Sequence, residues 1–163
     1  MSSSPARPGL SGWRLTAVLS AALGAMSVGV VAVAGGGEEG VRALLRATAR
    51  SSALLFVLVY VARPLHQLRP GALSRFALRE RRHLGVAVAV SHAIHLGAIV
   101  ALARGWPASF AAGTEASTLV VGGLAFVLLF AMAATSSDAA VRRLGRARWR
   151  ALHRTGLHLL WFV

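Results

Sequence analysis

Four apolar runs, each about twenty residues long, dominate this sequence of 163 residues. A helix needs about 20 apolar residues to cross the ~30 Å hydrocarbon core of a bilayer. Within lipid, only helices and closed barrels satisfy their own backbone polar groups, and apolar runs of this length are typical of helices. The chain is therefore predicted to be an all-α membrane protein. The four runs cover residues 15–34, 43–62, 84–103 and 116–134. The second run is interrupted near its start by Arg46 and Arg50.

A fifth apolar segment begins near Trp149 or Thr155 and continues to the last residue. It is shorter than a membrane span, so we expect a bundle of about five transmembrane helices whose fifth helix is incomplete. Residues 1–14 are expected to form a disordered cytoplasmic lead, and residues 15–163 a single transmembrane domain. The first run also resembles a cleaved signal peptide because it ends in Ala32-Val33-Ala34, although its apolar part is longer than the usual ~7–15 residues.

The composition excludes several classes of protein. Hydrophobic residues make up 56% of the chain and the mean hydropathy is +0.63. A soluble domain of this size could not bury so much apolar surface, and disordered chains are poor in hydrophobic residues. The chain has no cysteine, which excludes a disulfide framework, a thiolate zinc site, a cysteine-held iron–sulfur cluster and covalent c-type haem attachment.

The basic residues are clustered between the apolar runs. Eighteen arginines oppose five acidic residues, a net charge of +13 that in a soluble protein would indicate nucleic-acid binding. Residues 63–82 and 138–154 hold most of them, whereas 35–42 and 104–115 hold few. The positive-inside rule then places the N-terminus and both Arg-rich segments in the cytoplasm. We expect the lipid membrane, and not nucleic acid, to be the partner of these arginines.

Histidines are the unusual polar residues inside the apolar segments. His92 and His95 lie in the third run, and His153 and His158 lie at the start of the fifth. Intramembrane ionisable residues are costly and are candidates for function. His92 and His95 are three residues apart and share a helix face, and His95 lies about 16 Å along its span, near mid-bilayer. The four complete runs contain no Asp or Glu, which argues against a proton- or cation-coupled transporter.

Two neutral imidazoles from different helices can bind haem iron through one ring nitrogen each. The other nitrogen then needs a partner that fixes the tautomer, for which Ser91 or a backbone carbonyl is available. His153 and His158 are five residues apart, about 140° around a helix, so they cannot both face one partner. The alternative is that the histidines only connect helices through hydrogen bonds, or lie at the inner mouth of the bundle.

Two stretches of the sequence resemble a known family. The segment RRHLG at 81–85 is followed ten residues later by HL at 95–96, and ATSSD at 134–138 leads into RRLG and WRALHR. Together with TARS at 48–51, these motifs resemble the ferric reductase-like transmembrane family from about Ala47 to the C-terminus. The resemblance is particularly to the haem-binding membrane subunits of bacterial periplasmic methionine-sulfoxide reductase systems.

The resemblance implies a multi-pass helical bundle in the cytoplasmic membrane that holds b-type haem and passes electrons across the bilayer. His95 corresponds to the third-helix ligand of the family and His153 to the first histidine of the following helix, so both are expected to bind haem iron. His92 and His158 are further candidates for holding the cofactor. The electron donor would be a quinol or a separate reductase, with any flavin or quinone supplied by partners. The acceptor would be a periplasmic redox partner.

A second hypothesis comes from the incomplete fifth segment. The family places a further ligand about a dozen residues beyond the position of His153, past the last residue of this chain. The chain would then be a haem-less or truncated membrane anchor, or an assembly subunit of a redox complex. In the first hypothesis it is the electron-transferring membrane component of an oxidoreductase.

Overall fold

The computed structural model describes residues 10–162, and helices make up almost all of this part of the chain. Among these residues, α1, α2, α3 and α5 are long and apolar enough to cross a membrane. The predicted all-α membrane fold is therefore confirmed. The helices, in chain order, are α1 (Gly12–Ala34), α2 (Glu38–Leu68), α3 (Ala72–Gly105), α4 (Pro107–Ala112), α5 (Ala116–Ala134), α6 (Asp138–Leu144) and α7 (Arg146–Phe162).

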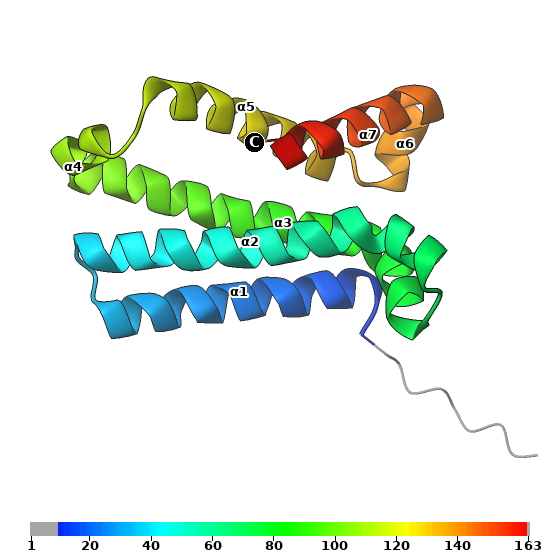
Figure 1. Ribbon diagram of the computed structural model, residues 1–163, viewed down its shortest axis with the longest axis horizontal. Helices are drawn as coiled ribbons and strands as arrows, with labels where there is room; N and C mark the ends of the chain where they lie inside the picture. Colours follow the sequence, from blue (N-terminus) through cyan, green and yellow to red (C-terminus); the bar gives the residue numbers. More distant parts are fainter. Residues whose placement is uncertain (1–9, 163) are drawn as a thin grey trace, which may run out of the picture.

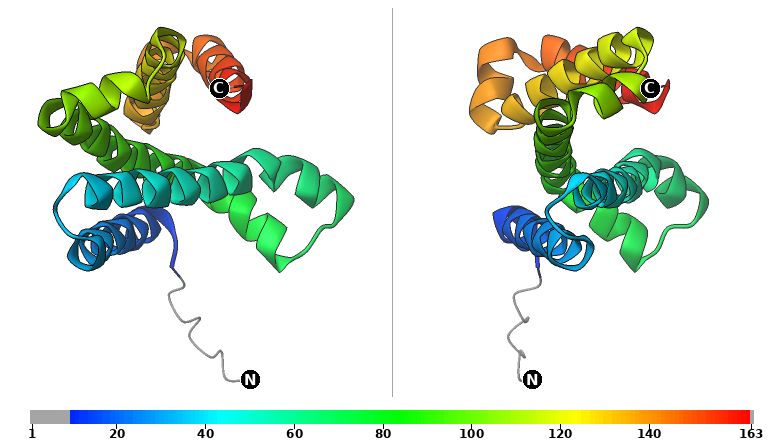
Figure 2. Two further views of the ribbon diagram at one scale, coloured as in Figure 1. Left: turned by 60° about the vertical axis from the view of Figure 1, so that its left-hand side comes forward. Right: turned by 90° about the vertical axis from the view of Figure 1, so that its left-hand side faces the viewer.

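The helices form two layers. Helices α1, α2 and α3 lie antiparallel in one layer, and α5 and α7 lie side by side across α3 (Figure 1). Figure 2 shows α5, α6 and α7 gathered on one side of α3, with α1 on the other. The apolar core joins the layers and includes Leu15 of α1, Val59 of α2, Leu84 and Val88 of α3, and Leu129 of α5.

The first helix begins earlier than the sequence predicts. Gly12 to Arg14 are helical, although they belong to the predicted disordered lead, and residues 1–9 of that lead lie outside the described residues. The Gly12 N–H donates a hydrogen bond of 2.7 Å to Glu80 of α3. This bond satisfies one of the N–H groups that the first turn of a helix leaves without a partner.

Helices α2 and α3 also extend beyond their apolar runs. Helix α2 continues beyond the apolar run 43–62, through Pro64 to Leu68. The backbone N–H of Arg69 donates to the Leu65 carbonyl, which completes a helical turn after the proline. Helix α3 has 34 residues and is about 51 Å long, which exceeds the ~30 Å hydrocarbon thickness. Its Arg-rich first turns therefore lie outside the apolar layer.

The turn from α5 to α7 is fixed by local hydrogen bonds. Ser137 caps α6 by accepting a bond of 3.1 Å from the Ala140 N–H, as expected of short hydroxyl side chains before a helix. Gly145, at φ +78°, then turns the chain into α7. Helix α7 begins at Arg146, ahead of the predicted start, and the Trp149 indole donates to the Thr135 carbonyl over 2.9 Å. With 17 residues, α7 is too short to count among the four spanning helices in the described part of the chain, and its first half also carries four arginines.

Candidate functional site

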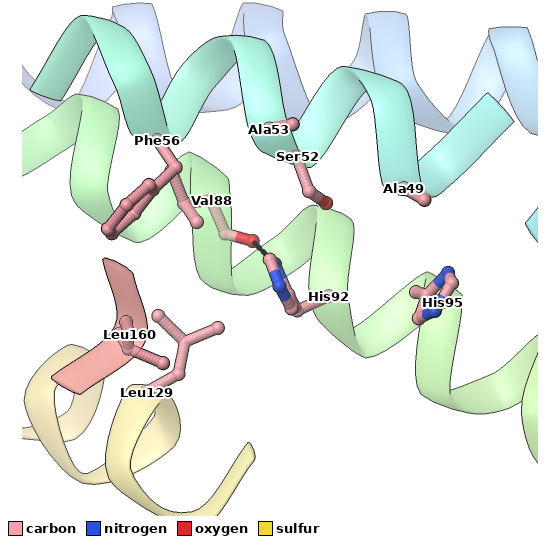
Figure 3. Close-up of a pocket in the computed structure, with 9 residues that line it drawn as sticks. All are labelled: Ala49, Ser52, Ala53, Phe56, Val88, His92, His95, Leu129 and Leu160. Atoms are coloured by element: carbon pink, nitrogen blue, oxygen red, sulfur yellow. Dashed lines mark hydrogen bonds between the residues drawn. The ribbon is translucent and has the colours of Figure 1, made fainter. Parts of the chain in front are cut away.

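A cavity of about 260 Å³ lies between the two layers (Figure 3). Helices α2 and α3 form one wall, and α5 and α7 contribute one leucine each to the other. Ser52, His92 and His95 are the polar members of an otherwise apolar lining. The lining residues are Ala49, Ser52, Ala53, Phe56, Val88, His92, His95, Leu129 and Leu160.

His95 is held from the neighbouring helix. Its Nδ1 lies 2.8 Å from the Thr48 hydroxyl of α2. That hydroxyl also lies 2.7 Å from the Leu44 carbonyl, which can only accept. When the hydroxyl donates its proton to this carbonyl, its oxygen accepts from the imidazole, and His95 is then the Nδ1–H tautomer, whose Nε2 keeps the lone pair that a metal ion requires.

His92 has the same tautomer for a different reason. Its Nδ1 lies 3.1 Å from the backbone carbonyl of Val88, one turn earlier in α3. Because a carbonyl oxygen only accepts, Nδ1 carries the proton and Nε2 is free. The two rings have centroids 6.5 Å apart, and Phe126 of α5 packs against both, at 5.9 Å from His92 and 6.4 Å from His95.

A cluster of hydroxyl groups fixes α2 against α3 beside these rings. The Ser52 hydroxyl donates to Ser91 over 2.7 Å, and Ser51 lies 3.1 Å from the same oxygen. Ser91 in turn donates to the Thr48 carbonyl over 3.4 Å. The sequence suggests Ser91 or a backbone carbonyl as the partner of a ligand histidine, and a backbone carbonyl is the partner of His92. Thr48, and not Ser91, serves His95.

The structure places the other two predicted histidines outside this cavity. Both ring nitrogens of His153 lie 3.1 Å from backbone carbonyls, Nδ1 from that of Trp149 and Nε2 from that of Met132. A neutral imidazole donates to only one of these carbonyls, and the lone pair of its other nitrogen then faces the second carbonyl oxygen, so neither nitrogen points toward a metal ion in this conformation. His158 lies with its Nδ1 3.4 Å from the Tyr60 hydroxyl. The structure therefore brings together His92 and His95, whereas His95 and His153 do not share a cavity.

The donor set and the lining fit a haem. An imidazole with a free Nε2 is a suitable axial ligand, and the walls of Phe56, Leu129 and Leu160 are apolar, as a porphyrin face requires. His92 and His95 lie on the same wall, so only one of them can be an axial ligand of a given iron, and no other histidine among residues 10–162 lines the cavity. The volume of 260 Å³ is slightly below the ~300–1,000 Å³ usual for small-molecule sites.

Sequence reasoning missed two residues of the site. The sequence shows Thr48 as a polar residue inside an apolar run and as the first residue of the TARS motif, and neither feature predicts a contact with His95. Phe126 carried no signal, because one aromatic residue in an apolar helix is ordinary core. Its place beside both imidazoles depends on how α5 packs across α3.

Comparison with known proteins agrees with this site. The family model described as ferric reductase like transmembrane component matches residues 47–163, which include every residue that lines the cavity. The chain belongs to this family. The match begins in α2, next to Thr48, and leaves α1 outside it.

Several proteins that are similar to this chain are called protein-methionine-sulfoxide reductase heme-binding subunit MsrQ. The protein from Azospira oryzae is 35% identical over 96 residues, which cover 53% of this chain and 41% of that protein. The protein from Rhodospirillum rubrum is 38% identical over 48% of this chain and 39% of its own length. The protein from Polaromonas naphthalenivorans is 34% identical over 77% of this chain and 59% of its own length. The chain thus spans about half the length of the relatives it matches, and no solved structure matches it.

Proposed function

We propose that this chain is a haem-binding subunit of the cytoplasmic membrane that carries electrons between the two sides of the bilayer. One observation carries the proposal: two imidazoles in the middle of a long apolar helix line an apolar cavity, and each keeps Nε2 free. The similar proteins from Azospira oryzae and Polaromonas naphthalenivorans are called heme-binding subunits, which supports the proposal.

His95 is the residue that would hold the haem iron, through Nε2. His92 provides a second Nε2 on the same wall of the cavity. His153, which the family motif also marks, becomes available only after its contacts with the Trp149 and Met132 carbonyls break. When bound, a haem supplies a one-electron carrier, and the surrounding apolar side chains exclude water from it.

The charges indicate the orientation of the chain in the membrane. Both Arg-rich segments lie at the end of the bundle that the positive-inside rule assigns to the cytoplasm. A quinol or a separate reductase would deliver electrons at this side. By analogy with the name of the relatives, the acceptor would be a methionine-sulfoxide reductase at the opposite, periplasmic face.

A reduced-minus-oxidised absorption spectrum of membranes that contain this chain tests the proposal. The wild type should show haem bands that the His95→Ala variant loses or shifts. His66→Ala is the matched control, because His66 lies at the end of α2 and contacts Ser74, away from the cavity. Absence of haem bands in the wild type would overturn the proposal and favour the haem-less anchor.

A further inference from the structure

Thr48 is a completely buried hydroxyl in the α2 membrane segment, with 0% of its surface exposed. We propose that Thr48 is a positioning residue that selects the tautomer of His95 and so presents Nε2 of His95 to a ligand. This inference rests on the proposed function, because it assigns Thr48 a role in preparing the site for haem.

The count of protons and lone pairs supports this role. A threonine hydroxyl has one proton to donate and two lone pairs that accept. The proton is taken within α2, because Oγ1 lies 2.7 Å from the Leu44 carbonyl and 3.1 Å from the Leu45 carbonyl. With the proton on that side, the contact of 2.8 Å with His95 is donated by the imidazole Nδ1–H, which is the direction that the proposal assigns.

Thr48 is itself held in place by α3. Ser91 donates to the Thr48 carbonyl, and Ser51 lies 3.0 Å from the same carbonyl oxygen. Ser52 then donates to Ser91, which closes the link between the helices. This hydroxyl cluster fixes the position of α2 relative to α3 at the level of His95, so the acceptor stays opposite Nδ1.

The two histidines differ in what sets their tautomers. The proton of His92 is held by a carbonyl of its own helix, and it does not depend on α2. The proton of His95 is held by Thr48, across the helix interface. Without that acceptor, the His95 proton can move to Nε2, and a protonated Nε2 cannot bind a metal ion. Removal of the Thr48 hydroxyl should therefore change His95 and leave His92 unchanged.

The decisive experiment is ¹⁵N NMR of the imidazole nitrogens in the haem-free protein in detergent micelles. Both His92 and His95 should be Nδ1–H tautomers in the wild type. In Thr48→Val, which keeps the side-chain shape, the tautomer ratio of His95 should move toward Nε2–H by about fivefold, as expected for one lost hydrogen bond. Thr48→Ser keeps the acceptor and should retain the wild-type signals. Thr48→Ala gives the same test as Thr48→Val if valine disturbs folding, and His92 is the internal control.

A second measurement connects this role to cofactor binding. Loss of a partner that orients a metal-binding histidine typically weakens binding about 10–100-fold, so Thr48→Val should weaken haemin binding to that extent and Thr48→Ser should restore it. If His95 keeps its tautomer in both Thr48→Val and Thr48→Ala, the positioning role is wrong even where the wild type binds haem. If the wild type shows the expected tautomers and binds no haem, the proposed function fails and the assignment of the His95 tautomer to Thr48 stands.

Discussion

Close packing between α5 and α7 should make Gly156 intolerant of a side chain. Gly156 is buried on α7, and a Cβ atom built there would displace the sulfur of Met132, which lies near the end of a flexible side chain, and would lie 3.4 Å from Leu128 of α5, against which the two further carbons of a valine would have to pack. The Gly156→Val substitution adds three carbon atoms where the first already overlaps. Overpacking of this kind costs about 1–3 kcal/mol. For a chain of this length, that cost corresponds to a fall of about 2–12 °C in Tm.

Thermal unfolding in detergent, followed by circular dichroism, measures this effect. Gly123→Val is the matched control, because Gly123 lies on the exposed face of α5 and an added Cβ meets no atom within 4 Å. The control should match the wild type to within a few tenths of a kcal/mol, since valine is a better helix former than glycine. Equal Tm values for Gly156→Val and Gly123→Val would refute the packing of α7 on α5. Such a result would also remove Leu160 of α7 from the cavity wall.

Two further predictions concern α3. Hydrogen bonds from Arg79 and from the Gly12 N–H hold the pKa of the Glu80 carboxyl, in the Arg-rich stretch before the apolar segment, below its ordinary value. A carboxyl whose pKa is lowered in the folded state stabilises the protein at pH values above its ordinary pKa, and this stabilisation is lost as the pH falls through the lowered pKa. The Glu80→Gln variant should therefore lose that part of the acid dependence of Tm. Identical profiles of Tm against pH for the variant and the wild type would contradict the contact. Ser91→Ala removes the acceptor of the Ser52 hydroxyl inside the bundle, so Tm should fall by about 2–4 °C for a loss of about 1 kcal/mol, and an unchanged Tm would show that this bond is not formed.

The position of a helix could be predicted from the sequence where the helix coincides with a long apolar run. Helix α5 begins and ends at the predicted residues 116–134, because nearly every side chain in it is apolar and its flanks are polar. The ends of α2 and α3 were not predicted, since their polar extensions have no hydropathy signal and depend on helix formation beyond the apolar layer. Pro64 is the clearest case, because a proline that usually ends a helix lies inside one.

The candidate site was predictable only in part. The spacing of His92 and His95 correctly places them on one face, which the structure confirms by the cavity that both line. Thr48 was not predicted as a partner, because its approach to His95 depends on the register of α2 against α3. His153 illustrates the same limit. The motif marks it as a ligand, while the packing of α7 on α5 directs its ring to backbone carbonyls.

Titration of the purified chain with haemin, followed at the Soret band, tests the central claim most directly. The account predicts that the wild type binds haemin with a shifted Soret band. His95→Ala should weaken this binding by more than about tenfold, because loss of even an outer-shell partner costs about 10–100-fold. Binding by His95→Ala with the affinity and spectrum of the wild type would contradict the account, since the iron would then be held elsewhere than at His95.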